Sequence, residues 1–374
     1  FGRRMQPEAQ TLVILIPGFP KSEADTTCLP LQQALVKTIS REYPQLKVVV
    51  LAFHYPFKQR RYNWQGVPVQ AFAGKDWLKL LKVYNWIKVW LALKKLKRTQ
   101  RVAGILSFWL GECALIGEYF AKRHGLKHYC WILGQDAKPL NPYLTLMNAN
   151  GDSLIALSDF ISETMTKNYG ITPRHLIPGG IDGSLFKSGY EERTIDILGA
   201  GSLICLKQYH LFIEVVCRLR HRFPHIKAVL CGEGPDRARL TGMIKKLHME
   251  DHITLVGEVP HPQVLELMAR SKVFLHTSNY EGLGMVCLEA LYAGAKVISL
   301  VRPIQHPITN WHIAANTVEM ADIATDILQN PDTKYQKSAP YLIEDVAAQM
   351  VELYLDKPPA ISLKRPSIAD KEIV

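Results

Sequence analysis

The chain has 374 residues, more than a single hydrophobic core usually serves, so we expect two domains. Its composition, 48% hydrophobic and 21% charged, is typical of a folded globular protein. No run approaches the roughly 20 apolar residues that span a bilayer, which argues against a membrane-spanning protein. The start lacks the layout of a secretory signal, and seven cysteines without a CxxC pair fit reduced thiols. We therefore expect a cytoplasmic protein.

The net charge of +11 is concentrated between Lys75 and Arg101, a segment that contains nine Lys and Arg residues and a single acid, Asp76. This excess indicates an anionic partner, such as membrane lipid, nucleic acid or a phosphorylated acceptor. Residues 75–98 also interleave Trp, Tyr and Leu, and such a helix can lie on an anionic membrane with its Trp residues at the interface. The alternative is a helix packed on a sheet with a solvated basic face. Helical projection spreads the cations over more than one face, which leaves both interpretations open.

Apolar runs of strand length alternate with segments of helix length in the first half of the chain. The expected strands are residues 11–16, 47–51, 104–107, 128–133 and 153–157. This alternation predicts a parallel sheet with helices on both faces, as in a Rossmann-like domain. The first strand is followed by Pro17-Gly18-Phe19-Pro20, a loop at its carboxyl end, where open α/β sheets bind ligands.

A second alternating series follows a polar, irregular stretch at 188–193, which we interpret as the linker. Its expected strands are 195–199, 227–231, 253–256, 273–276 and 297–300, and its expected helices are 209–222, 235–247, 262–269, 285–293 and 320–328. We therefore expect two doubly wound α/β domains, the first over 1–187 and the second over 188–344. Residues 345–374 are expected to form a C-terminal helix and a tail that cross back to the first domain.

The clearest chemical signature runs from Glu281 to Glu289. Gly282 and Gly284 let the backbone pass close to a ligand, and the helix beginning near Gly284 presents unpaired N–H groups to a diphosphate or a sugar hydroxyl. Glu281 can accept hydrogen bonds from sugar hydroxyls, and Glu289 can reach ribose hydroxyls. The plainer alternative is a solvated loop acid and an exposed helix acid.

The run EGLGMVCLEALYAGAKVIS resembles the E-x7-E signature of retaining GT-B glycosyltransferases of family 4, the glycosyl transferases group 1. The resemblance implies a GT-B fold, an α/β architecture of two Rossmann-like doubly wound domains that face a central cleft. It implies transfer of a sugar from a nucleotide diphosphate sugar to a glycan or lipid-linked acceptor, with retention of the anomeric configuration. It implies no cofactor and no metal, and the sequence has neither a DxD motif nor a His/carboxylate cluster.

Other segments stand in the order that this family uses. The stretch 199–203 followed by Lys207 resembles its Gly-Arg-Leu...Lys element, in which Lys207 would carry the diphosphate charge. Ser202 takes the position of the usual arginine. The Gly-x-Gly-Pro loop at 232–235 and the strand end at Gly257 resemble loops around the nucleobase, with a tight turn after a strand as the alternative. The donor-binding residues that the resemblance implies are Gly18, Gly201, Ser202, Gly232, Glu233, Gly234, Gly257, Gly282, Leu283, Gly284, Met285 and Glu289.

In the first domain, the loop around Gly18 looks like the glycine loop that approaches the donor phosphates. Leu133-Gly134-Gln135-Asp136-Ala137 resembles a His-Gly-x-Asp-like loop that faces sugar and acceptor, with Leu133 in place of the common His. Asp136 is its polar candidate, and capping of the loop is the alternative. The implied catalytic residues are therefore Glu281, Lys207 and Asp136.

The expected partners are the nucleotide-sugar donor, the acceptor and, through 75–98, an anionic membrane surface; no nucleic acid is expected. Membrane binding would place the protein at the inner face of the cell membrane. The rivals are a nucleotide-sugar epimerase of the same fold, a phosphorylase, a dinucleotide-dependent oxidoreductase and a non-catalytic nucleotide-binding protein. The oxidoreductase is disfavoured because PGFP, not GxGxxG, follows the first strand. No pyridoxal-phosphate lysine motif supports a phosphorylase, and Ser202 alone supports a non-catalytic protein.

Overall fold

The computed structural model describes residues 9–74, 79–187 and 192–355. These form two compact units: residues 9–180 with 343–355, called the N-terminal unit, and residues 181–342, called the C-terminal unit. Residues 75–78 of the predicted basic helix, residues 188–191 of the predicted linker and the predicted tail beyond 355 lie outside the described residues.

The N-terminal unit is built on an eight-stranded sheet with the order β3-β4-β2-β1-β5-β6-β7-β8. Its strands are β1 Gln10–Gly18, β2 Leu46–Tyr55, β3 Arg60–Trp64, β4 Val67–Ala71, β5 Val102–Phe108, β6 Lys127–Ile132, β7 Leu154–Ala156 and β8 His175–Leu176. Its helices are α1 Pro30–Glu42, α2 Lys79–Thr99, α3 Glu112–His124, α4 Pro142–Met147, α5 Asp159–Tyr169 and α11 Ile343–Glu352. All neighbouring strands are parallel except β3 and β4, which form an antiparallel hairpin at one edge.

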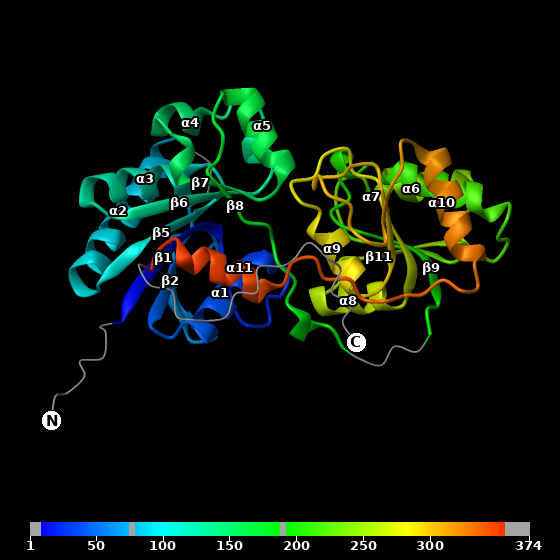
Figure 1. Ribbon diagram of the computed structural model, residues 1–374, viewed down its shortest axis with the longest axis horizontal. Coiled ribbons are helices and arrows are strands. Elements are labelled where there is room, and N and C mark those ends of the chain that lie inside the picture. Colours follow the sequence, from blue (N-terminus) through cyan, green and yellow to red (C-terminus); the bar gives the residue numbers. More distant parts are fainter. Residues whose placement is uncertain (1–8, 75–78, 188–191, 356–374) are drawn as a thin grey trace. The chain divides into compact units, whose positions relative to one another are not determined.

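Helices cover both faces of this sheet. Val13 and Leu15 of β1 pack with Ile105 of β5 against residues of α2 and α3. On the other face, Tyr354, just beyond α11, lies against Gly104 of β5 and donates its hydroxyl hydrogen to the Ile105 carbonyl oxygen at 2.9 Å. Side chains alternate along a strand, so α11 covers the face that α2 and α3 leave open. Figure 1 shows α11 beside α1, although the two helices are far apart in the sequence.

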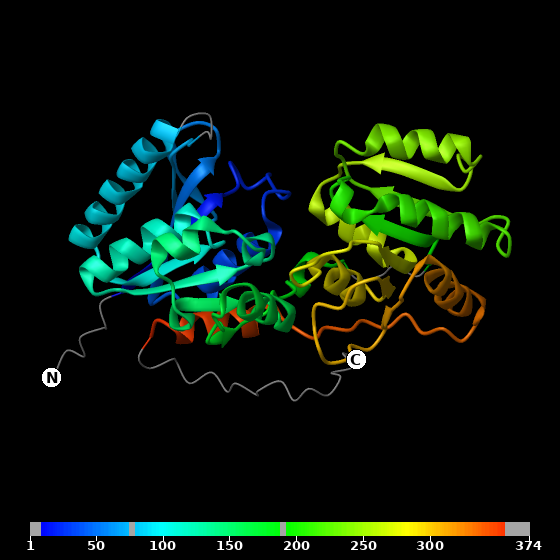
Figure 2. The same ribbon diagram turned by 90° about the horizontal axis from the view of Figure 1, so that it is seen from above.

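The C-terminal unit contains a six-stranded, wholly parallel sheet with the order β11-β10-β9-β12-β13-β14. Its strands are β9 Ile195–Ala200, β10 Ala228–Cys231, β11 Ile253–Gly257, β12 Ser271–His276, β13 Lys296–Ser299 and β14 Trp311–Ile313. Its helices are α6 Tyr209–Arg220, α7 Arg237–Lys246, α8 His261–Ala269, α9 Met285–Tyr292 and α10 Thr317–Gln329. Figure 1 shows α6, α7 and α10 on one side of this sheet and α8 and α9 on the other, and Figure 2 shows the same unit from above.

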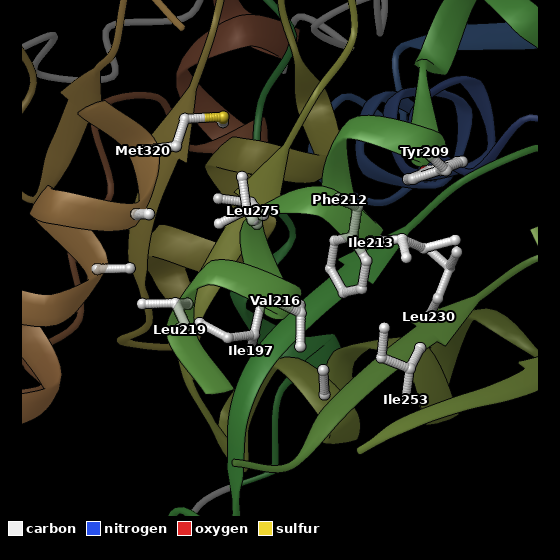
Figure 3. Packing of buried hydrophobic residues seen from close by; sticks show 14 of the residues in the cluster. Ile197, Tyr209, Phe212, Ile213, Val216, Leu219, Leu230, Ile253, Leu275 and Met320 are labelled. Carbon is white, nitrogen blue, oxygen red and sulfur yellow. The ribbon is translucent and has the colours of Figure 1, made fainter. Parts of the chain in front are cut away.

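The core of the C-terminal unit explains its amphipathic helices. Phe212, Val216 and Leu219 point from α6 onto Ile197 and Leu230 of the sheet (Figure 3). Side chains of α7 and α10 complete the same cluster. Helices α8 and α9 contact each other, and α9 contacts β12 and β13. The unit is therefore doubly wound, and the strands and helices predicted for the second series are confirmed to within a few residues.

The two units carry parallel sheets of the Rossmann-like kind, as expected from the alternation of apolar runs. The β3–β4 hairpin and the short strands β8 and β14 were not predicted. Within the described residues, no helix is both long enough and apolar enough to cross a membrane.

Candidate functional site

The predicted donor-binding residues of the second half gather at one edge of the C-terminal sheet. Lys207 follows β9, the 232–234 loop follows β10, Gly257 ends β11, and Glu281 follows β12. These strands are parallel, so their carboxyl ends meet at the same edge. The chain winds outward in both directions from β9, to β10 on one side and to β12 on the other. This reversal of strand order is the position at which open α/β sheets bind their ligands.

Lys207 and Glu281 meet at that reversal. Lys207 closes the short 3-10 turn Cys205–Lys207, and its Nζ donates to Oε1 of Glu281. The same oxygen lies 2.9 Å from Nε2 of His276, the last residue of β12. The two loops are also tied by their backbones, because the Thr277 hydroxyl donates to the Lys207 carbonyl oxygen at 2.7 Å. The structure thus joins two predicted residues that lie 74 positions apart in the sequence.

The charge of Glu281 is strongly stabilised. Burial alone would raise the pKa of its carboxyl, but the hydrogen bond from His276 and the charges of His276 and Lys207 lower it to about 2. The side chains of Lys207 and Glu281 are only 19% and 14% exposed, so water screens the pair weakly. The positive charge of Lys207 and the negative charge of Glu281 cancel within the pair. The ammonium group nevertheless lies at the sheet edge where the strand carboxyl ends meet.

Glu289 is held by a histidine that the sequence interpretation did not include. It lies on α9, and its Oε1 is 2.8 Å from Nε2 of His261, the first residue of α8. Burial alone would lower the pKa of His261, but the hydrogen bond and the charge of Glu289 raise it. In this structure Glu289 is therefore oriented by His261. Its predicted bond to ribose hydroxyls stays a prediction.

The loop between Glu281 and Met285 delivers the start of α9 to the same edge. Gly284 is the N-cap residue in the left-handed region (φ 74°), which glycine adopts without strain. Gly282, Leu283 and Gly284 are buried, and no side chain caps the helix. The first N–H groups of an α-helix have no partner within the helix, so this end is electrostatically suited to an anion.

The glycines of the neighbouring loops have a packing reason as well as a predicted ligand role. A Cβ atom on Gly232 would overlap the carbonyl oxygen of Gly201, and one on Gly234 would overlap that of Leu203. The Gly232 N–H also donates to the carbonyl oxygen of Gly257 at 2.8 Å. Close contact between the loops after β9, β10 and β11 thus requires these glycines, and their approach to a nucleobase stays a prediction.

Charged residues at this edge differ in whether they have partners. Glu233 is paired with Arg237 one helical turn later, at 2.6 Å. Ser202, in the position of the family's arginine, is exposed. Arg302, in the loop after β13, is also exposed and has no ion-pair or hydrogen-bond partner among the described residues. Arg302 is therefore an exposed cation in the loop after β13 that sequence analysis did not single out, because the loop 300–310 contains no recognisable motif.

In the N-terminal unit, Gly18 ends β1 next to a polar pair that was not predicted. A Cβ atom on Gly18 would lie 3.2 Å from Cβ of Tyr55, so glycine suits this tight strand end. Beside β1, His54 near the end of β2 and Glu112 at the start of α3 approach to 3.5 Å between Nε2 and Oε1. Burial alone would raise the pKa of Glu112, but hydrogen bonds from His54 and Trp86 and nearby positive charge lower it. A sequence signal existed, since His54 stands near the carboxyl end of β2 and Glu112 lies in the segment that follows β5.

Asp136 caps the loop in which it lies. Its Oδ2 accepts from the Leu110 N–H at 2.8 Å, and its Oδ1 accepts from the Gly134 N–H at 2.8 Å. Burial raises the pKa of Asp136, while these backbone hydrogen bonds oppose the rise. Both carboxylate oxygens thus serve the backbone of this loop, which is the alternative considered from the sequence. A catalytic role for Asp136 has no support in this geometry and stays a prediction.

Across residues 9–74, 79–187 and 192–355, no group of three or more His, Cys, Asp or Glu residues could hold a metal ion.

Part of the chain is similar in sequence to known proteins. Residues 182–331 match the family model of glycosyl transferases group 1. A phosphatidylinositol N-acetylglucosaminyltransferase polypeptide from Arabidopsis thaliana is 27% identical over 165 residues, which are 43% of this chain and 37% of the relative. A glycogen synthase from Mycobacterium tuberculosis is 26% identical over 178 residues, 46% of this chain and 43% of the relative. The chain spans less than half the length of these curated relatives.

Solved structures align with a larger share of the chain than these curated relatives do. Sucrose-phosphate synthase from Thermosynechococcus elongatus aligns with 92% of this chain and 98% of its own, with a TM-score of 0.69 and 16% identity. HepE from Anabaena, solved with UDP and glucose, aligns with 92% of this chain and 95% of its own, with a TM-score of 0.65 and 16% identity. At this identity the likeness establishes the fold alone. The chain therefore has the GT-B fold of glycosyltransferases, and its residues 182–331 match glycosyl transferases group 1.

Proposed function

We propose that this protein transfers a sugar from a nucleotide diphosphate sugar to a glycan or lipid-linked acceptor. The observation that carries the proposal is the meeting of Lys207 and Glu281 where the strand order of the C-terminal sheet reverses, inside the segment that matches the glycosyltransferase family. An ammonium group, a helix N-terminus and a carboxylate there suit a diphosphate and a sugar. The proposed roles follow from their chemistry.

Lys207 and the start of α9 would stabilise the leaving diphosphate, whose negative charge grows as the bond to the sugar breaks. Glu281 neutralises Lys207 in this structure, so a diphosphate would share or take over that ammonium group. The Glu281 carboxylate would then accept hydrogen bonds from sugar hydroxyls, and it would keep its hydrogen bond with His276. Glu289, oriented by His261, would accept hydrogen bonds from the ribose.

A single cation leaves the charge of a diphosphate incompletely balanced. We expect Arg302 to supply the second one, in place of the arginine that Ser202 replaces. Arg302 follows β13, and the nearby Leu300 N–H donates to the His276 carbonyl oxygen at 3.3 Å, so its loop begins beside the strand that leads to Glu281. With Lys207, Arg302 and the α9 terminus carrying the leaving-group charge, transfer without a metal ion is the proposed chemistry. Retention of the anomeric configuration rests on the E-x7-E resemblance.

The acceptor would bind to the N-terminal unit. The ends of β1, β2 and β5 bring Gly18, His54 and Glu112 to one edge of that sheet, also where its strand order reverses. By name, the Arabidopsis relative acts on phosphatidylinositol and the Mycobacterium relative makes glycogen, which is why both lipid-linked and glycan acceptors are proposed. The cytoplasmic location stays a prediction.

The alternatives predict different products. An epimerase of the same fold would isomerise the donor without any acceptor, whereas a non-catalytic protein would bind the donor and leave it unchanged. Product analysis after incubation with donor, with and without acceptor, separates the three.

We expect Lys207→Ala and Glu289→Ala each to abolish transfer while the chain stays folded. For Lys207→Ala, loss of the positioned charge at the leaving group raises the barrier by roughly 3 kcal/mol, a loss of at least about a hundredfold in rate. For Glu289→Ala, the donor loses its proposed hydrogen bonds to the ribose. Turnover is measured by release of nucleoside diphosphate in the presence of acceptor, with circular dichroism as the check on folding. Glu250→Ala, at an exposed position, is the control and should be as active as the wild type. Near-normal turnover of both site variants would refute the assignment.

A further inference from the structure

Helix α2 has apolar side chains both on the face that packs against the core and on the face that is exposed. Its inner face supplies Val89, Ala92 and Leu93 to the core of the N-terminal unit. Trp86 and Trp90 also turn inward: Nε1 of Trp86 donates to Oε2 of Glu112 at 2.6 Å, and Trp90 packs edge-on against Phe120. Trp86 and Trp90 therefore pack partly against the core of the N-terminal unit, and Trp77 lies outside the described residues.

The outer face of α2 is apolar as well. Val83, Tyr84, Ile87 and Leu91 are 48%, 57%, 52% and 57% exposed. Spacings of three and four residues place them along one side of an α-helix. Scattered exposed apolar residues are normal on protein surfaces, but a contiguous row of four on one helix indicates an interaction surface.

The outer face of α2 is basic toward the C-terminal end of the helix. Lys94 is seven residues after Ile87, and Arg98 is seven after Leu91, so each lies two turns further along the same side. Lys94, Lys95 and Arg98 are exposed. Lys88 is half-buried, with its Nζ 4.3 Å from the centre of the Tyr84 ring. No Asp or Glu occurs between Lys79 and Thr99. Although the cations are spread over more than one face in the helical projection of the sequence, the exposed part of the helix thus combines an apolar row with a basic end.

We propose that this outer face of α2, defined by Val83, Tyr84, Ile87, Leu91, Lys94, Lys95 and Arg98, binds the surface of an anionic lipid bilayer. The basic end complements anionic headgroups, and the apolar row enters the boundary between headgroups and acyl chains. A nucleic acid or a soluble phosphorylated acceptor would match the cations but would leave the aliphatic side chains in water. The surface belongs to the N-terminal unit, whereas Lys207 and Glu281 belong to the C-terminal unit, so it does not depend on the transfer reaction.

The test is sedimentation with vesicles of phosphatidylcholine alone or with about a third phosphatidylglycerol. We expect the wild type to bind the anionic vesicles at low salt, to bind them more weakly as salt rises, and to bind neutral vesicles weakly. Ile87→Asp/Leu91→Asp should lower binding at least about tenfold, because each acid opposes both insertion and headgroup attraction. Lys94→Gln/Lys95→Gln/Arg98→Gln should lower it by roughly a hundredfold at low salt, since each cation near such a surface contributes about fivefold.

The matched control is Leu146→Asp/Val318→Asp, which adds the same two acids at apolar positions that are 54% and 48% exposed on other helices. It should bind like the wild type. The proposal is overturned if the wild type fails to bind anionic vesicles at low salt, or if the Ile87/Leu91 variant and its control lose binding equally. It is also overturned if the wild type binds a DNA duplex in preference to vesicles and the Ile87/Leu91 variant binds that duplex equally well. Thermal unfolding establishes that each variant is folded, and the three-residue Gln variant tests the surface without adding acids.

Discussion

Folding strongly changes the ionisation of Glu281. Its pKa is about 2 in the folded chain against an ordinary value of 4.5, because His276 and Lys207 outweigh the effect of burial. As the pH falls, the unfolded chain takes up this proton before the folded chain does. The stabilisation is therefore present above pH 4.5 and is lost as the pH falls toward 2.

We expect Glu281→Gln to lower the free energy of unfolding, with a pH-dependent part that reaches about 3 kcal/mol at neutral pH, from roughly 1.4 kcal/mol per pKa unit. This part should shrink as the pH falls below 4.5, because the wild type then loses the same charge. Urea unfolding of both chains between about pH 7 and about pH 3 measures it. Glu250→Gln, at an exposed position, is the control and should show little change. A difference between wild type and Glu281→Gln that is constant with pH would contradict the ion-pair account.

At the scale of residues, the sequence predicted candidate residues better than the contacts between them. Lys207 and Glu281 were recognised because strand ends and an E-x7-E pattern surround them. Their mutual contact was not predictable, since it depends on β9 and β12 being neighbours in the sheet. His276 and His261 were missed because one ends an apolar strand and the other begins a helix after a proline, and neither position is unusual in sequence.

Among the elements, the loops after β9 and β10 are the most tightly fitted. The Gly232 backbone has φ 144°, and a Cβ there would overlap the Gly201 carbonyl oxygen. Gly242, in α7, has nothing within 4 Å of the position that a Cβ would take. The two glycines are thus a matched pair in one unit.

Gly232→Ala should destabilise the chain by about 2 kcal/mol or more, through overlap and backbone strain. Gly242→Ala should stabilise it by roughly 0.5–1 kcal/mol, because alanine is the better helix former. Thermal and urea unfolding of the two variants measure both effects. Equal changes of the same sign in the free energy of unfolding would contradict the close contact between Gly232 and the Gly201 carbonyl oxygen.

Elements were predictable where the apolar pattern is strong. The strands of both sheets follow continuous apolar runs, as expected for strands covered on both faces. The β3–β4 hairpin escaped prediction because Arg60 and Arg61 open it, which interrupts the apolar pattern. The orientation of α2 escaped prediction because apolar residues lie on both its faces, so projection alone could not separate the packed face from the exposed one.

At the scale of the whole molecule, length and alternation were sufficient to predict two doubly wound units. The return of α11 to the N-terminal unit depends on long-range packing, seen in the contact of Tyr354 with Gly104 and Ile105. The identity of the donor and the acceptor cannot be read from these features, because base recognition uses backbone groups that many sequences supply.

The central claim is that the edge around Lys207, Glu281 and Arg302 binds a nucleotide diphosphate sugar. Its most direct measurement is thermal unfolding of the chain with uridine, guanosine and adenosine diphosphate sugars. The account predicts that one nucleotide class raises the midpoint by a few degrees at saturating concentration, as expected for binding to the folded state alone. Arg302→Ala should reduce the shift and Lys207→Ala should abolish it. No shift with any donor, or equal shifts in all three proteins, would contradict it.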